Sequence, residues 1–279
     1  MKPTYRTNVI ARAIAGIYNK PLDHATDWYE IKAAADDEIE MFVYDYIGWP
    51  FNDAGELVRA ISEMRGKKIT VRINSPGGDV LDAMAIYNAF TGHDAKVTTR
   101  AEALAASSAS IILLAGKEVQ AYQNAMLMIH EPWAMMAGNQ HDMREMAELL
   151  GKINDNMVDI YSKQSSTGKK EIRELLKAET WLTAKEAKEK GFIDTIIDEK
   201  VAKAAFDLSM FANVPDELRP ADSVEPTIRD AERALRDAGF SRSTAKAVLA
   251  RGWNDDGADE AEQEAQLKTL LQESISAWR

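Results

Sequence analysis

The sequence contains no cysteine and only four histidines among its 279 residues. The absence of cysteine excludes disulfide bonds, thiolate catalysis and cysteine-ligated zinc. No two histidines stand four residues apart, which is the spacing with which a helix presents two imidazoles to one metal ion. We therefore expect neither a metal nor a cofactor.

Positively charged residues are outnumbered by negatively charged ones, 34 to 45, and long apolar runs are scarce. The formal net charge is −11, which would repel a phosphate backbone and argues against nucleic acid as a partner. The longest apolar run, Ala109–Gly116 (ASIILLAG), is far shorter than the ~20 residues that span a membrane. The N-terminus has no basic-then-apolar signal pattern. We expect a soluble, cytoplasmic protein without a membrane partner.

Alternating strand and helix patterns dominate the first 200 residues. A strand with Ile69, Val71 and Ile73 at alternate positions is followed by a glycine pair and a helix. Further strand patterns lie near 28–31, 40–47, 95–103 and 124–130, and helix patterns near 54–64, 105–116 and 140–163. This order favours an α/β fold with a largely parallel sheet.

The character of the chain changes near residue 200. Residues 1–37 are predicted as an N-terminal segment and 38–200 as one domain. Residues 201–226 are rich in proline and aspartate and are interpreted as a linker, and 227–279 as a helical tail. An apolar stripe on the last predicted helix could bind a partner, self-associate or dock on the chain's own domain.

Two glycines, Gly77 and Gly78, lie between a strand and a helix in the stretch VRINSPGGDVLDA. Unpaired N–H groups at a helix start favour negative charge, so such a turn can hold a phosphate or an oxyanion formed during acyl transfer. A purely structural turn is the alternative. The stretch does not match the phosphate-loop motif of nucleotide-binding proteins, because no Gly-Lys-Ser/Thr follows.

Serine, histidine and glutamate residues are further candidates for acyl-transfer chemistry. Ser107, Ser108 and Ser110 lie at a strand-to-helix junction, where a serine either caps the helix or, with a base in reach, acts as a nucleophile. His130 follows a buried strand and could be that base, although it could equally be structural. Glu179 could supply the acid that orients the imidazole, although composition alone would not select it.

Four motifs occur in a recognisable order: INSPGGDVLDAMAIYN, AASSASIILLAG, MLMIHEPW and ETWLTAKEAKEKGFID. Together, over about residues 38–198, they resemble the Clp protease proteolytic subunit (ClpP) family of serine peptidases. They are most similar to the branch encoded by phages and prophages, the head maturation proteases.

This resemblance implies a ClpP/crotonase-type fold with a protruding handle helix at Gln140–Lys163 and a helical C-terminal tail. It also implies a ring-shaped homo-oligomer. The handle's Met143, Met146, Leu149 and Leu150 could form a contact face between rings or belong to the core. The segment before Glu40 does not resemble the family's axial loops, so we expect no dependence on a Clp ATPase.

The family motifs also assign the site. The resemblance implies Ser107 as nucleophile, His130 as base and Glu179 as the third member of the triad, with the amides of Gly78 and Ser108 as the oxyanion hole. Glu179 replaces the usual aspartate, and the hydroxyl of Ser108 is a rival nucleophile.

The expected substrate is a polypeptide, namely a capsid or scaffold protein cut during head maturation in the host cytoplasm or procapsid. Two alternatives remain: a crotonase-like acyl-CoA enzyme, and a catalytically inactive structural assembly protein.

Overall fold

The computed structural model describes residues 28–35, 37–64, 66–198, 206–208, 210–215 and 218. Most of the predicted N-terminal segment, most of the predicted linker and the whole predicted tail lie outside these residues. The domain boundaries at 37, 200 and 226 therefore stay predictions.

Eight strands and six helices alternate along the described chain. The strands are β1 (Tyr29–Ala35), β2 (Glu38–Tyr44), β3 (Lys68–Ser75), β4 (Val97–Ala106), β5 (Glu118–Tyr122), β6 (Met126–Ile129), β7 (Thr180–Thr183) and β8 (Thr195–Ile197). The helices are α2 (Ala54–Glu63), α3 (Val80–Thr91), α4 (Ser108–Leu113), α5 (Gln140–Lys163), α6 (Lys169–Lys177) and α7 (Ala184–Glu189).

The strands form one sheet in the order β1-β2-β3-β4-β5-β8, with β6 pairing with both β4 and β7. The β1–β2 and β6–β7 pairs are antiparallel, and the other pairs are parallel. This confirms the predicted α/β class with a largely parallel sheet. Strand β4 changes partner along its length: residues 98–101 pair with β5, and residues 104–106 pair with β6.

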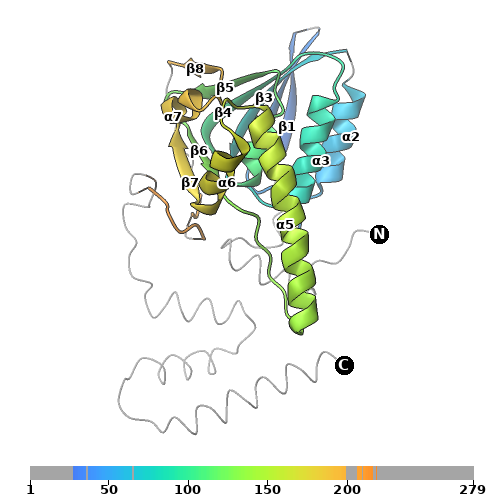
Figure 1. The fold of residues 1–279 in the computed structure, drawn as a ribbon. Helices are drawn as coiled ribbons and strands as arrows, with labels where there is room; N and C mark the ends of the chain where they lie inside the picture. The colour runs from blue at the N-terminus through green and yellow to red at the C-terminus, as the bar shows by residue number, and fades with distance from the viewer. Residues whose placement is uncertain are drawn as a thin grey trace, which may run out of the picture. The chain divides into compact units, whose positions relative to one another are not determined.

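The main core lies between the sheet and its helices (Figure 1). The predicted alternation in β3 is confirmed, since Ile69, Val71 and Ile73 are each at most 1% exposed. Helices α2 and α3 lie side by side over this core (Figure 1). Helix α3 begins where the Asp79 carboxylate caps the amides of Leu81 and Asp82, a standard N-cap.

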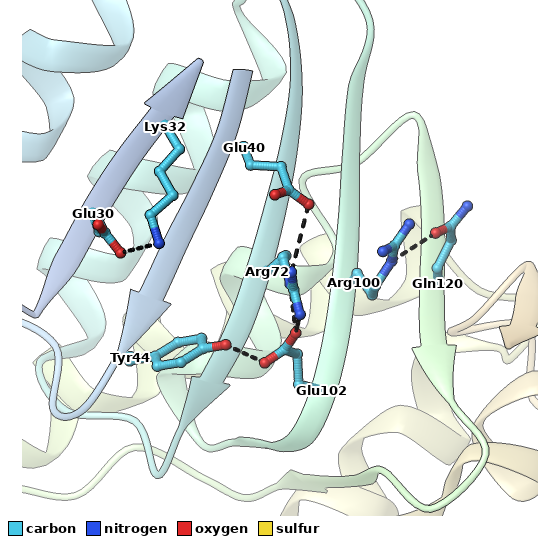
Figure 2. A network of polar contacts seen from close by, with 8 residues as sticks. All are labelled: Glu30, Lys32, Glu40, Tyr44, Arg72, Arg100, Glu102 and Gln120. Carbon is cyan, nitrogen blue, oxygen red and sulfur yellow. Dashed lines mark hydrogen bonds and ion pairs between the residues drawn. The ribbon is translucent and has the colours of Figure 1, made fainter. Parts of the chain in front are cut away.

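The opposite face of β1–β5 carries polar side chains (Figure 2). Glu102 is buried there, and it pairs with the Arg72 guanidinium and accepts a hydrogen bond from the Tyr44 hydroxyl. Burial and the neighbouring Glu102 carboxylate both raise the pKa of Tyr44. The network continues with the contacts Arg72–Glu40, Arg100–Gln120 and Lys32–Glu30.

Helix α5 runs away from the sheet at its N-terminal end (Figure 1), where Asn139 and Asp142 form a capping box. Its buried residues, Ile153, Met157, Val158 and Tyr161, all lie in the second half. Met143 and Leu149 are 44% and 48% exposed, and Met146 and Leu150 are partly exposed. These four residues are therefore not core residues of this chain.

No helix in the described part of the chain is both long and apolar enough to cross a membrane.

Candidate active site

Ser107 lies in the turn between β4 and α4 and has an unusual backbone conformation, with φ 52° and ψ −129°. A non-glycine residue in such a region carries about 1–3 kcal/mol of strain. The turn is held in place because the Ser107 amide donates to the Met128 carbonyl oxygen at 2.8 Å. The side chain of Ser107 does not cap α4, so its hydroxyl is available for another partner.

That partner is His130. The Ser107 Oγ lies 2.7 Å from the His130 Nε2, a normal hydrogen-bond distance for a nucleophile and its base. His130 directly follows β6, which pairs in parallel with the end of β4, so the sheet itself brings the two residues together. Burial lowers the pKa of His130, while the nearby Glu179 carboxylate acts in the opposite direction. Burial therefore favours the neutral imidazole, which can accept a proton.

The glycine turn packs tightly against this nucleophile turn. A Cβ on Gly77 would lie 2.7 Å from the Ser107 Cβ, and one on Gly78 would lie 2.0 Å from the Ile47 carbonyl oxygen. Both glycines have positive φ, 99° and 153°. The turn is fixed by the bonds from the Ile47 amide to the Gly77 oxygen and from the Asp79 amide to the Ile47 oxygen. Only glycine fits at either position.

Gly78 and Ser108 both line the same cavity as Ser107 and His130. Within the described residues, neither backbone amide donates to another backbone group outside the regular helix and strand bonding, and Ser108, as the first residue of α4, has no acceptor within its own helix. Two unpaired N–H groups beside a candidate nucleophile are what an oxyanion hole requires.

The hydroxyl of Ser108, the rival nucleophile, has no such base. Ser108 is 2% exposed, and its Oγ is buried without a hydrogen-bond partner in the described part of the chain. Because a serine hydroxyl needs a base within hydrogen-bond reach to act as a nucleophile, the geometry favours Ser107.

A third serine supports the backbone of Ser107. The Ser110 Oγ donates to the Ser107 carbonyl oxygen at 2.6 Å and lies 2.6 Å from the hydroxyl of Tyr161 in α5. Since Ser110 uses its only proton for the carbonyl, Tyr161 is the donor in the second bond. Burial raises the pKa of Tyr161, which keeps its hydroxyl protonated. The long helix is thus connected to the nucleophile turn through buried hydroxyls.

Glu179 lies close to His130 but is not hydrogen-bonded to it within the described residues. It occupies the turn between α6 and β7 with a φ of 47°. Its Oε1 accepts the Asn213 amide at 2.6 Å and the Trp181 Nε1–H at 3.4 Å. The structure therefore brings Ser107 and His130 into contact and places Glu179 near them with its carboxylate turned to other donors. The role of Glu179 as third triad member stays a prediction.

The cavity over these residues has a volume of about 250 Å³. Its wall is largely aromatic and apolar and includes Trp49, Phe51, Trp133, Met135 and Met157. In the described residues, no group of three or more histidine or carboxylate side chains could hold a metal ion.

The wall residues were not identified from the sequence. Trp49 and Phe51 follow β2, and Trp133 and Met135 follow β6, so each pair lies just beyond the end of a sheet strand. Ligand sites in such sheets lie beyond the carboxyl ends of the strands. Aromatic residues clustered in these two segments could therefore have indicated the cavity wall.

Comparison with known proteins identifies the family of the chain. The family model described as Clp protease matches residues 23–200, more than half of the chain. The ATP-dependent Clp protease proteolytic subunit 1 of Salinibacter ruber is 28% identical over 162 residues, covering 55% of this chain and 70% of the relative.

The corresponding proteolytic subunit of Deinococcus radiodurans is 31% identical over 146 residues, covering 52% of this chain and 72% of the relative. That of Bacteroides fragilis is 33% identical over 137 residues, covering 48% and 66%. The chain therefore belongs to the Clp protease family, a family of peptidases.

Proposed function

We propose that the chain is a serine endopeptidase in which Ser107 is the nucleophile and His130 the general base. The observation that carries this proposal is the 2.7 Å contact between the Ser107 Oγ and the His130 Nε2 beside the cavity. Membership of the Clp protease family supports peptide-bond hydrolysis as the reaction.

The reaction proceeds through an acyl-enzyme. His130 takes the hydroxyl proton while the Ser107 oxygen attacks the peptide carbonyl, and it then gives the proton to the leaving amine. A water molecule, deprotonated by the same imidazole, releases the acyl group and regenerates the serine. Burial lowers the pKa of His130 and so keeps the imidazole neutral before the first step, the form that can accept the proton.

The amides of Gly78 and Ser108 stabilise the negative charge that develops on the carbonyl oxygen. Loss of one such donor costs about 3–4 kcal/mol of transition-state stabilisation. Backbone amides held by a rigid turn suit this role, since they need no reorganisation during the reaction.

Glu179 is the proposed acid that stabilises the protonated imidazole. Its carboxylate raises the pKa of His130 against the effect of burial, which is the direction that this role requires.

We further propose that the enzyme belongs to the phage and prophage branch and cuts capsid or scaffold proteins without a Clp ATPase. The order of the four sequence motifs supports the branch. The segment before Glu40, which does not resemble axial loops, supports independence from an ATPase. Residues 227–279 would serve as a scaffold or docking segment.

We propose a ring-shaped homo-oligomer as the working assembly. The exposed Met143 and Leu149 on the projecting half of α5 support a contact between copies, because large apolar side chains on one helix face commonly mark an interface.

The two alternative functions fit the observations less well. The family match is to the Clp proteases, which disfavours an acyl-CoA enzyme. The hydrogen bond between Ser107 and His130 disfavours an inactive assembly protein, because a structural role does not need a serine paired with a base.

Fluorophosphonate labelling of the intact protein tests the proposal. We expect one modified residue, mapped by mass spectrometry to Ser107, and no labelling of Ser107→Ala. The control Ser62→Ala removes an exposed serine of α2 and should be labelled as the wild type is. An unlabelled wild type, or a label on Ser108, would reject the assignment.

Incubation with a capsid or scaffold precursor tests the substrate separately. Cleavage without ATP by the wild type, and none by Ser107→Ala, is expected. Labelling of Ser107 without cleavage of any such precursor would retain the peptidase and reject the phage substrate.

A further inference from the structure

A short segment beyond the family-matched region returns to the candidate active site. We call residues 206–208 and 210–215 the clamp segment. Its residues Leu208, Phe211 and Val214 are only 6–7% exposed. They pack against Leu104, Ala106 and Met128 in a second hydrophobic cluster. These partners belong to β4 and β6, the strands that lead into Ser107 and His130.

The aromatic ring of Phe211 contacts the catalytic candidate directly. Its centroid lies 5.6 Å from that of the His130 imidazole, at an interplanar angle of 83°. It also lies 5.8 Å from the Trp181 ring, at 78°. Both are edge-to-face arrangements, which are favourable and directional. Phe211 therefore limits the orientations that the imidazole can take and keeps water from one side of it.

Asn213 makes the second contact. Its amide donates to the Glu179 Oε1 at 2.6 Å, and its side-chain Nδ2 donates to the Ala178 carbonyl oxygen at 2.9 Å. One residue thus holds both the carboxylate of Glu179 and the backbone before it. Because a bond to a charged acceptor is stronger than a neutral one, this contact fixes where the carboxylate lies relative to His130.

We propose that the clamp segment is a positioning element of the active site, in which Phe211 orients and covers His130 and Asn213 holds Glu179. This inference rests on the proposed serine peptidase function. It assigns a catalytic contribution to residues outside the region that matches the family, 23–200. Neither Phe211 nor Asn213 is among the described residues that line the cavity, so both act through His130 and Glu179.

The alternative is that the segment only fills an apolar groove. Both roles predict that loss of Phe211 lowers stability, so stability alone cannot separate them. A positioning role also predicts a change in the pH dependence of the reaction. Removing the ring exposes the imidazole to water and raises the pKa of His130 toward its ordinary value. The acid limb of the rate profile then moves to higher pH.

The surroundings of His130 allow this effect to be isolated. The Glu179 carboxylate is the charged group that acts on the His130 pKa, and it raises it. The neighbouring Glu131 carboxylate instead accepts the Asn154 Nδ2 of α5. Phe211 is uncharged, so its substitution changes how the His130 imidazole is covered and removes neither the Glu179 nor the Glu131 carboxylate.

The experiment measures the rate of fluorophosphonate labelling against pH, together with thermal unfolding, on the full chain. Phe211→Leu is compared with Phe90→Leu, the same substitution in the main core on α3. Phe211→Tyr keeps the ring and serves as the conservative rescue. We expect Phe211→Leu to label roughly three- to tenfold more slowly, the equivalent of one aromatic pair.

Two results would support the inference: an acid limb moved to higher pH in Phe211→Leu but not in Phe90→Leu, and its return in Phe211→Tyr. Equal profiles for the wild type and Phe211→Leu would overturn it, as would equal displacement of the limb in both leucine variants. A wild type that is not labelled at all would instead overturn the peptidase function itself. The two failures are therefore distinguishable.

Discussion

A single methyl group at position 77 would act directly on the nucleophile. Gly77 has a φ of 99°, and a Cβ added there would lie 2.7 Å from the Ser107 Cβ and 2.8 Å from the Ala106 carbonyl oxygen. Neither neighbour is the end of a flexible side chain. In Gly77→Ala the nucleophile turn must therefore move, or the glycine turn must move away from it.

The structure gives the size of the effect. Carbon atoms in contact ordinarily lie about 3.5–4.0 Å apart, so the two groups must separate by about 1 Å. A misplacement of about 1 Å near reacting atoms can cost about 100-fold in rate. The positive φ adds about 1–3 kcal/mol of backbone strain, which for a chain of this size corresponds to about 2–4 °C of melting temperature per kcal/mol.

Gly66→Ala is the matched control. Gly66 has a φ of 78°, but a Cβ there meets nothing within 4 Å. It should show the strain without the displacement, that is, a lower melting temperature with normal fluorophosphonate labelling. Labelling of Gly77→Ala at the wild-type rate would refute the reasoning, as would an equal loss of labelling in Gly66→Ala.

Two further predictions concern charged groups. Burial lowers the pKa of His130 and the Glu179 carboxylate raises it, so Glu179→Gln should lower the pKa and move the acid limb of the labelling rate to lower pH. An upward movement would contradict the proposed role. Arg72→Met should lower the free energy of unfolding by about 3–5 kcal/mol, because it leaves the buried Glu102 carboxylate without its cation and with only the Tyr44 hydroxyl as partner. Lys169→Met, which breaks an exposed pair, should cost at most about 1 kcal/mol in the same denaturation assay.

The sequence was sufficient for the elements that carry strong periodicity. Strand β3 and helix α5 were predicted from patterns that the structure confirms, because alternation and helical spacing follow directly from which side chains are buried. The proximity of Ser107 and His130 came from the family resemblance. Nothing in the 22 residues between them indicates that β4 and β6 are neighbours.

The contacts of Glu179 could not be predicted from the sequence. Its carboxylate depends on a turn with positive φ and on a donor at Asn213, 34 residues later. The clamp segment was missed for a different reason. Proline and aspartate around residues 215–222 suggest a linker, and this composition masks the spacing of Leu208, Phe211 and Val214, three residues apart. Apolar residues at this regular spacing could have predicted that the segment packs against the domain.

The backbone conformation of Ser107 favours glycine, whereas the proposed reaction needs a hydroxyl at this position. A glycine would adopt φ 52° with less strain, yet it would have no hydroxyl to offer His130. Position 107 is therefore one where the residue best suited to the backbone and the residue needed for reaction are different. The hydrogen bonds from the Ser107 amide to the Met128 oxygen and from the Ser110 hydroxyl to the Ser107 oxygen hold this turn in place, which allows the chain to tolerate a serine there.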